Sequence, residues 1–242
     1  MLFRSIVLRS CLFAAVQLLI TPPFSVIALL TFPFHPFTRY RIIRYWTRFV
    51  LWALKVICGI NFRVTGAEHL PPGPCVVLSK HQSAWETMAF QLIFPPQVYV
   101  IKRELLWIPF FGWGLAMCSP IAINRSAGPR AARQMLSQGK DRIAAGFWVI
   151  VYPEGTRVAP GARGKYQSPG SAIAIHAGAP VVPVAHNAGR CWRRNAFLKH
   201  PGTITVSIGP VIDSRGRKAD ELTREVEHWI EGEMARIDPG HA

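Results

Sequence analysis

A histidine and a glutamate, His81 and Glu86, lie five positions apart in the chain. A carboxylate on one imidazole nitrogen fixes the tautomer and makes the other nitrogen a better base, which can take a proton from a hydroxyl. In a continuous helix the two side chains would point about 140° apart, so they can meet only if His81 lies in a turn and Glu86 in a first helical turn. A second interpretation stays open, because Ser83 and Glu86 also have the spacing of a capping box.

A second group of residues has the chemistry of an anion-binding loop. Gly155 permits a backbone geometry that exposes N–H groups, Thr156 adds a hydroxyl, and Arg157 offers a planar guanidinium that suits phosphate. Lys102 and Arg125 also fall at or just after the ends of predicted strands. Several cations at one edge of a sheet indicate a phosphate site; the alternative is a surface turn with solvated basic side chains.

Patterns for other reaction types are missing from the sequence. It contains no G-x-S-x-G turn, no H-E-x-x-H motif and no G-x-x-x-x-G-K-[ST] loop, which leaves direct transfer to a hydroxyl that a base activates. The five cysteines are scattered and form no C-x-x-C pair, which predicts free thiols. The remaining histidines lack a comparable setting and are expected on the surface or in the core: His35, His69, His176, His186, His200, His228 and His241.

Alternating short strands and helices are predicted to position these residues. Apolar, β-branched runs predict strands at residues 75–79, 98–102, 120–124, 147–152, 181–185 and 203–208. Helical patterns lie at residues 84–94, 129–145, 172–177 and 220–237. This alternation is typical of an α/β domain with a mainly parallel sheet flanked by helices. Loops that follow the strands build the active site in such sheets, and both candidate groups fall in these loops.

The first 60 residues predict a membrane anchor ahead of a domain over residues 61–242. Ser10 to Phe34 carries no charge and is long enough to cross a bilayer, which takes about 20 helical residues. Pro22 and Pro23 interrupt this run, which is therefore one kinked span or a hairpin in a single leaflet. The positive-inside rule favours the hairpin, because it keeps the arginines on both sides of the run at the cytoplasmic side of the inner membrane.

A basic amphipathic helix is predicted after the apolar run. Four cations spaced by three, four and seven share one stripe of this helix, whose other surface is largely apolar: Arg41, Arg44, Arg48 and Lys55. The pattern suits an anionic lipid surface, where each cation contributes roughly 1 kcal/mol. The alternative is an ordinary core helix with a solvated stripe. The formal net charge of +15 also implies an anionic partner, and the apolar stretches favour membrane lipid or a phosphorylated substrate.

Five motifs, in order, resemble the 1-acyl-sn-glycerol-3-phosphate acyltransferases of the glycerolipid acyltransferase superfamily, from about Phe62 to Ile212. His81 with Glu86 is similar to the H-x-x-x-x-D motif of that family. The other matches are Lys102 to Gly112, Ile123-Asn124-Arg125, Tyr152-Pro153-Glu154-Gly155-Thr156-Arg157, which looks like F-P-E-G-T-R, and Val182-Pro183-Val184. The chain departs from the family's usual residues at Glu86, where Asp is common, and at Tyr152, where Phe is common.

The resemblance implies acyl transfer from acyl-CoA or acyl carrier protein to the sn-2 hydroxyl of lysophosphatidic acid. The product would be phosphatidic acid, formed without a covalent enzyme intermediate. His81 would be the general base and Glu86 its orienting partner. The glycerol phosphate would be bound by residues of several loops: Lys102, Arg125, Glu154, Gly155, Thr156 and Arg157. No metal and no tightly bound cofactor is implied.

Three other functions compete with this one. The same chemistry on glycerol 3-phosphate or another lysolipid would keep the fold and the base. A non-enzymatic membrane-binding module would use the basic helix and have no need of His81. Nucleic-acid binding would need cations interleaved with stacking aromatics on a folded face, whereas the densest cationic cluster here directly follows the apolar run.

Overall fold

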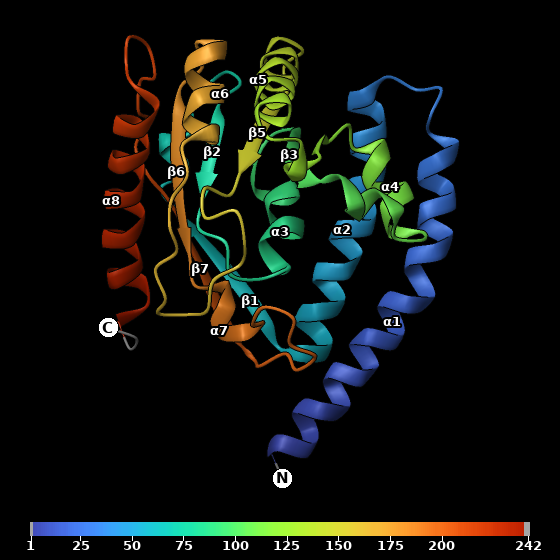
Figure 1. Cartoon of the computed structure of the whole chain (residues 1–242). Helices are drawn as coiled ribbons and strands as arrows, with labels where there is room; N and C mark the ends of the chain where they lie inside the picture. Colours follow the sequence, from blue (N-terminus) through green and yellow to red (C-terminus); the bar gives the residue numbers. More distant parts are fainter. Residues whose placement is uncertain (1, 240–242) are drawn as a thin grey trace.

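A seven-stranded sheet forms the centre of the molecule in the computed structural model of the chain (Figure 1). The structure describes residues 2–239, apart from the side chains of Leu2, Phe3 and Arg125. The strands are β1 Ile60–Thr65, β2 Val76–Ser79, β3 Gln97–Lys102, β4 Ile121–Ile123, β5 Trp148–Val151, β6 Val181–His186 and β7 Gly202–Ile208. Their order is β1-β7-β6-β2-β5-β3-β4, and all neighbours are parallel except β6 and β7. The predicted α/β fold with a mainly parallel sheet is confirmed.

Helices surround this sheet and complete the chain. They are α1 Leu2–Leu30, α2 Pro36–Cys58, α3 Trp85–Ile93, α4 Phe111–Met117, α5 Pro129–Ala144, α6 Pro169–Ala177, α7 Ala188–Cys191 and α8 Ala219–Ile237, with 3₁₀ turns η1 Ala67–His69, η2 Arg103–Trp107 and η3 Arg125–Ala127. One hydrophobic cluster joins α2 and α3 to one face of the sheet, and a second joins α5, α6 and α8 to the other. Strands β2 and β5 are buried at every residue, which is why they are visible in the sequence as continuous apolar runs.

Strand β1 lies outside the predicted set. Among residues 2–239 it is an edge strand whose sheet neighbour is β7, in parallel register from Ile60 opposite Gly202. Its polar residues Asn61, Arg63 and Thr65 interrupt the apolar pattern. A search for short apolar runs finds strands that are buried on both faces and therefore passes over this one.

Helix α1 runs through Pro22 and Pro23 without reversing direction, which agrees with the kinked helix and not with the hairpin, the two alternatives that the sequence left open. Figure 1 shows that α1 bends along its length. Proline removes a backbone donor from a helix, and a serine hydroxyl that bonds the carbonyl four residues earlier also bends one, as Ser25 does to Thr21 at 2.8 Å. The helix continues past these residues because it packs against α2 and α4. Arg4–Leu30 is long and apolar enough to cross a bilayer, by length and composition.

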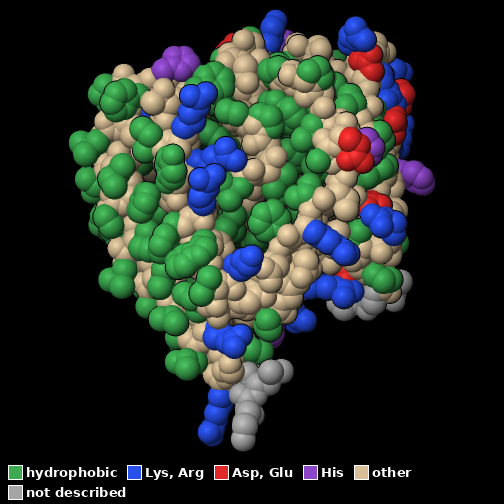
Figure 2. Space-filling view, turned by 180° about the vertical axis from the view of Figure 1, so that it is seen from behind, with side chains coloured by type: hydrophobic (Ala, Val, Ile, Leu, Met, Phe, Trp, Pro, Cys, Tyr) green, Lys and Arg blue, Asp and Glu red, His purple; other side chains and the backbone are tan. Residues whose placement is uncertain are grey.

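Helix α2 has a core face and an outer basic stripe, so it combines the two alternatives that the sequence left open. Arg41, Arg48 and Lys55 are exposed, and Arg44 donates to the carbonyl of Leu92 at 3.0 Å. The opposite face enters the same core cluster as the sheet through Val50, Leu51, Ala53, Leu54 and Cys58. Figure 2 shows Lys and Arg side chains in a column among hydrophobic side chains on the side where α1 and α2 lie. The boundary between anchor and domain at residue 60 stays a prediction.

Candidate active site

The imidazole of His81 and the carboxylate of Glu86 are in direct contact. His81 lies in the loop after β2 and Glu86 in the first turn of α3, as their spacing requires, and Nδ1 of His81 is 2.8 Å from Oε1 of Glu86. Because a carboxylate can only accept, Nδ1 carries the proton and Nε2 keeps its lone pair. The His81 side chain is 14% exposed and lines a cavity, so the basic nitrogen is accessible to a substrate.

Glu86 also holds the loop that carries the histidine. The same oxygen, Oε1, accepts from the backbone N–H groups of Gln82 and Ser83 at 2.9 and 2.7 Å. The capping and catalytic interpretations are therefore compatible. Burial opposes ionisation of Glu86, but the imidazoles of His186 and His81 and the Ser83 N–H outweigh burial and hold its pKa below the usual range. The carboxylate is thus charged at neutral pH and can stabilise an imidazolium.

An aromatic ring fixes the plane of the imidazole. Tyr152 stacks on His81 with ring centroids 3.8 Å apart and an angle of 13° between the planes. Tyr99 lies parallel to Tyr152 within the same 13°, at 6.3 Å. Burial raises the pKa of Tyr152 well above its usual value, so this ring stays neutral. Together, the carboxylate and the stack determine both the tautomer and the orientation of His81 before a substrate binds.

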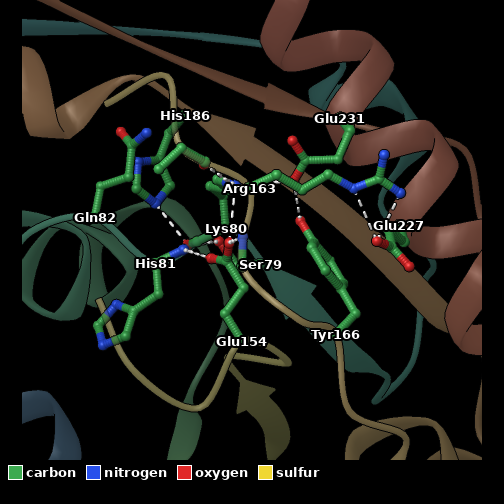
Figure 3. Close-up of polar contacts among 12 residues, drawn as sticks. Ser79, Lys80, His81, Gln82, Glu154, Arg163, Tyr166, His186, Glu227 and Glu231 are labelled. Carbon is green, nitrogen blue, oxygen red and sulfur yellow. Dashed lines mark hydrogen bonds and ion pairs between the residues drawn. The ribbon is translucent and has the colours of Figure 1, made fainter. Parts of the chain in front are cut away.

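Glu154, which the sequence assigned to substrate binding, is occupied by contacts within the chain. Its Oε1 is 2.8 Å from Nζ of Lys80 and accepts from the Gly164 N–H, and its Oε2 accepts from the His81 backbone N–H at 3.0 Å. Lys80 is 1% exposed and also bonds Glu231 of α8 at 2.8 Å. Burial raises the pKa of Glu154 although Lys80 and the two N–H groups oppose this. Figure 3 shows the network, with the ring of His81 directed away from it.

A cavity of about 670 Å³ lies beside His81. Its walls are mostly apolar and come from α1, α2, α3, β3, α4 and α5. Four of the six predicted substrate-binding residues line it: Lys102, Gly155, Thr156 and Arg157. Glu154 does not line it, and the side chain of Arg125 lies outside the described residues. The structure therefore brings cations, a hydroxyl and the basic histidine to the wall of one largely apolar cavity.

The loop after β5 has the backbone geometry that an anion site needs. Gly155 has φ +66°, a conformation that favours glycine. The Nε of Arg157 is buried and has no hydrogen-bond partner among the described residues. An unsatisfied guanidinium nitrogen is costly unless a ligand supplies the acceptor. The Arg157 guanidinium can therefore take an acceptor from an anionic group at this loop.

Several residues of the site had no signal that singled them out in the sequence. Glu231 is 151 positions from Lys80, so no local pattern could pair them. Arg194 lines the cavity and donates to the carbonyl of Arg157 at 3.0 Å. A usable signal did exist for Lys80, since a lysine that directly follows a fully buried strand needs a charged partner.

His186 is a core histidine, one of the two settings expected for it. It is fully buried, its Nε2 is 2.8 Å from the carbonyl of Lys80, and its Nδ1 accepts from the Ala188 N–H at 3.3 Å. Nε2 therefore carries the proton. Burial lowers the pKa of His186, and the carboxylate of Glu86 opposes this shift.

The cysteines are free thiols, as predicted. Burial raises the pKa of the Cys75 thiol and raises that of Cys118 to about 12, which makes both poor nucleophiles. Within residues 2–239, no group of three His, Cys, Asp or Glu side chains is arranged to hold a metal ion.

Comparisons with known proteins agree with this geometry. A family model described as acyltransferase matches residues 61–187. A 1-acyl-sn-glycerol-3-phosphate acyltransferase of Pseudomonas aeruginosa is 46% identical over 212 residues, 86% of this chain and 82% of that protein. The human 1-acyl-sn-glycerol-3-phosphate acyltransferase alpha is 29% identical over 180 residues, 72% of this chain and 63% of its own length.

A solved structure shares the fold. The 1-acyl-sn-glycerophosphate (LPA) acyltransferase of Thermotoga maritima superposes with a TM-score of 0.76 at 20% identity, covering 96% of this chain and 94% of that one. The matched family region contains both the His81 loop and the Gly155 loop. The chain belongs to the acyltransferase family.

Proposed function

We propose that this chain transfers a fatty acyl group from a thioester donor to the sn-2 hydroxyl of 1-acyl-glycerol 3-phosphate, which yields phosphatidic acid. One observation carries the proposal: the His81–Glu86 pair lies at the wall of an apolar cavity that also presents Lys102 and Arg157. An acceptor with a hydroxyl, an acyl chain and a phosphate matches these three features. The names of the P. aeruginosa and human relatives support this acceptor.

The reaction needs one base and no covalent intermediate. Nε2 of His81 removes the proton of the acceptor hydroxyl as its oxygen attacks the thioester carbonyl. Glu86 stabilises the imidazolium that forms. The tetrahedral intermediate then expels the thiolate, which takes the proton back from the imidazolium. The ester bond has formed, the thioester bond has broken, and the histidine is neutral again.

The phosphate of the acceptor is held by the cationic side of the cavity. Arg157 provides a guanidinium whose Nε has no partner among the described residues, and Lys102 and Thr156 line the same cavity. We assign Arg125 to this group from its motif alone. Glu154 acts differently, because its carboxylate bonds Lys80 and the His81 backbone and so positions the catalytic loop.

The donor is acyl-CoA or acyl carrier protein, since both are thioesters. The reaction requires no metal and no resident cofactor, because a base and a charged binding site are sufficient for it. The protein associates with membrane through α1 and the basic stripe of α2, and we place it on the cytoplasmic side of the inner membrane by the charge rule.

An acceptor panel tests the proposal. Purified protein is mixed with labelled acyl-CoA or acyl carrier protein and with 1-acyl-glycerol 3-phosphate, glycerol 3-phosphate or lysophosphatidylcholine. The expected result is labelled phosphatidic acid, a lower rate on glycerol 3-phosphate, and a lower rate on the choline lipid. The phosphate of 1-acyl-glycerol 3-phosphate is terminal, whereas that of lysophosphatidylcholine is esterified with choline. Equal rates with these two lysolipids would contradict the assignment of Arg157 to the phosphate.

A further inference from the structure

Residues 107–113, here called the aromatic segment, expose an unusual amount of apolar surface. Trp107 is 68% exposed, and Ile108, Phe110, Phe111 and Trp113 are 39 to 44% exposed. The whole stretch from residue 105 to residue 124 carries no charged side chain. Contiguous apolar surface of this kind marks a site that another apolar phase covers.

A tight turn directs these side chains outward. Phe110 has φ +61°, which is uncommon for a residue with a side chain, and the N–H groups of Phe111 and Gly112 bond Pro109 and Ile108 at 2.7 Å. A Cβ on Gly112 would lie 2.3 Å from the carbonyl of Leu106, so only glycine permits this close approach. The turn leaves Trp107 and Phe110 at the surface, and Phe111 lies both at the surface and at the cavity wall.

The inner side of the same stretch forms a wall of the catalytic cavity. Phe111, Gly114 and Leu115 line it together with Phe24 and Ser25 of α1. Figure 1 shows α4 beside α1, and these two helices pack against each other. The aromatic segment therefore separates the cavity from the outside at the place where the candidate membrane helix passes.

The surroundings identify the covering phase as lipid. Leu30 and Val26 of the neighbouring α1 are 71% and 48% exposed and extend the apolar surface. Lys102 is exposed at the start of η2, and Arg103 follows it. Tryptophan favours the boundary between headgroups and acyl chains, and lysine and arginine favour anionic headgroups. A protein partner would not require cations at the edge of the surface beside a helix of membrane length.

We infer that the aromatic segment inserts into an anionic phospholipid leaflet, as a second lipid contact besides α1, and that it opens the cavity sideways to the bilayer. The acceptor then enters from the leaflet without crossing water. The insertion stands on the exposed side chains and their location, and only the entry route rests on the proposed function.

Fluorescence quenching tests the insertion directly. The protein is mixed with vesicles of phosphatidylglycerol and phosphatidylcholine that carry bromine on their acyl chains, which quenches inserted tryptophan. We measure the decrease in tryptophan fluorescence that the brominated lipid causes. This decrease is expected to be smaller in Trp107→Phe than in the wild type, and to stay unchanged in Trp229→Phe, a control on α8. Equal losses in wild type and Trp107→Phe would overturn the inference, whatever reaction the protein catalyses.

Kinetics test the entry route. Trp107 and Ile108 do not line the cavity, so the double variant Trp107→Ser/Ile108→Ser keeps the cavity wall. Because the variant removes two large apolar side chains from the proposed lipid contact, we expect kcat/KM for an acceptor in vesicles to fall about tenfold or more. For a short-chain acceptor dissolved as monomers, kcat/KM should stay within about twofold of wild type, since that acceptor needs no bilayer. The control Val211→Ser changes neither value.

Two outcomes would overturn the route. An equal decrease in kcat/KM for both acceptors would show that the segment shapes the cavity itself and does not act through the bilayer. Sedimentation in detergent compares the oligomeric states of the wild type and the double variant. A dimeric wild type and a monomeric double variant would assign the surface to a second copy of the chain. If the wild type acylates neither acceptor, the proposed function fails, and the quenching experiment still decides the insertion.

Discussion

The loop after β2 and the cationic wall of the cavity differ in how their charged groups are paired. In the first region Glu86 accepts three hydrogen bonds at Oε1, although its buried Oε2 has no partner among the described residues, and Glu154 uses both oxygens on Lys80 and on backbone N–H groups. In the second, Arg157 keeps a buried Nε without a partner among the described residues, and Lys102 is exposed. The chain completes its catalytic pair by itself and leaves its cations for the substrate.

This difference indicates which part of the site is rigid. A base must be oriented before the reaction, and bonds within the chain avoid reorganisation at the moment of proton transfer. A phosphate site gains affinity when its donors are unsatisfied until the ligand arrives. Substitutions in the first region should therefore change turnover or folding, and substitutions in the second should change the use of the acceptor.

The largest expected effect concerns His81 and Glu86. His81→Ala should lose turnover by about 10²–10⁴-fold, the usual contribution of a general base. Glu86→Gln should fold normally, because an amide oxygen still accepts from Gln82 and Ser83, and should lose most turnover, because the negative charge is gone. The double variant should be little worse than His81→Ala, since the two act as a unit. Measured kcat and Tm decide this, and near-normal turnover of Glu86→Gln would reduce Glu86 to a cap.

Lys80→Met should damage folding more than any substitution at the cavity wall. It leaves the carboxylates of Glu154 and Glu231 without their buried cation, which costs about 3–5 kcal/mol. The control is Arg163→Met, which breaks an exposed pair with Glu227 and should cost less than about 1 kcal/mol. Urea unfolding of both variants measures the free energies. Similar losses would show that the Lys80 pair contributes no more than a surface contact.

Arg157→Ala should separate binding from folding. The loss of a charge-assisted hydrogen bond to phosphate costs about 1.5–3 kcal/mol, so kcat/KM for the acceptor should fall by roughly ten- to a hundredfold while Tm stays close to wild type. Arg193→Ala, an exposed arginine that does not line the cavity, is the matched control. Unchanged kinetics in Arg157→Ala would show that this loop does not bind the acceptor phosphate.

The stack on His81 predicts a smaller effect that depends on the ring. Tyr152→Phe keeps the aromatic face at 3.8 Å and should keep turnover, whereas Tyr152→Leu should lose it by a factor that corresponds to about 0.5–1.5 kcal/mol. Measured kcat decides this, and equal turnover in both variants would limit Tyr152 to a packing role.

The smallest expected effect is a pH dependence of stability from His186. Its folded pKa lies below the ordinary 6.5 because the ring is buried, next to Glu86, His81 and Lys80. As the pH decreases below about 6.5, His186 takes up a proton in the unfolded chain before it does so in the folded protein. The free energy of unfolding therefore decreases as the pH decreases, until the folded pKa is reached. His186→Gln keeps an N–H for the carbonyl of Lys80 and should flatten the fall of Tm in this window. An unchanged slope would mean that other groups cause it.

Local patterns were sufficient for most of the fold. Every predicted strand and helix after residue 60 is present, because buried strands are apolar throughout and helices show their own period. Helix geometry predicted that His81 and Glu86 meet only with His81 in a turn and Glu86 in a first helical turn, and the structure has them there. The rule that loops after parallel strands share one edge of the sheet predicted that Lys102 and Arg157 lie close together, and both line one cavity.

Contacts between distant segments could not be read in this way. Glu154 belongs to a motif that suggests ligand contact, yet its carboxylate faces Lys80, and the charge that completes this pair comes from Glu231 of α8. The prolines of α1 suggested a turn, and packing on α2 and α4 holds the helix through them. In both cases tertiary contacts decided the outcome over the local preference.

The pairing of Lys80 with Glu231 also determines when the fold can be completed during translation. Helix α1 is made before the sheet, and Glu231 of α8 is made 151 residues after the lysine whose charge it neutralises. Strand β1 likewise waits for β7, which supplies its sheet neighbour. The domain thus closes only after α8 has been made, when α1 has long left the ribosome. The Lys80 network that supports the His81 loop is therefore completed well after the helix of membrane length has been synthesised.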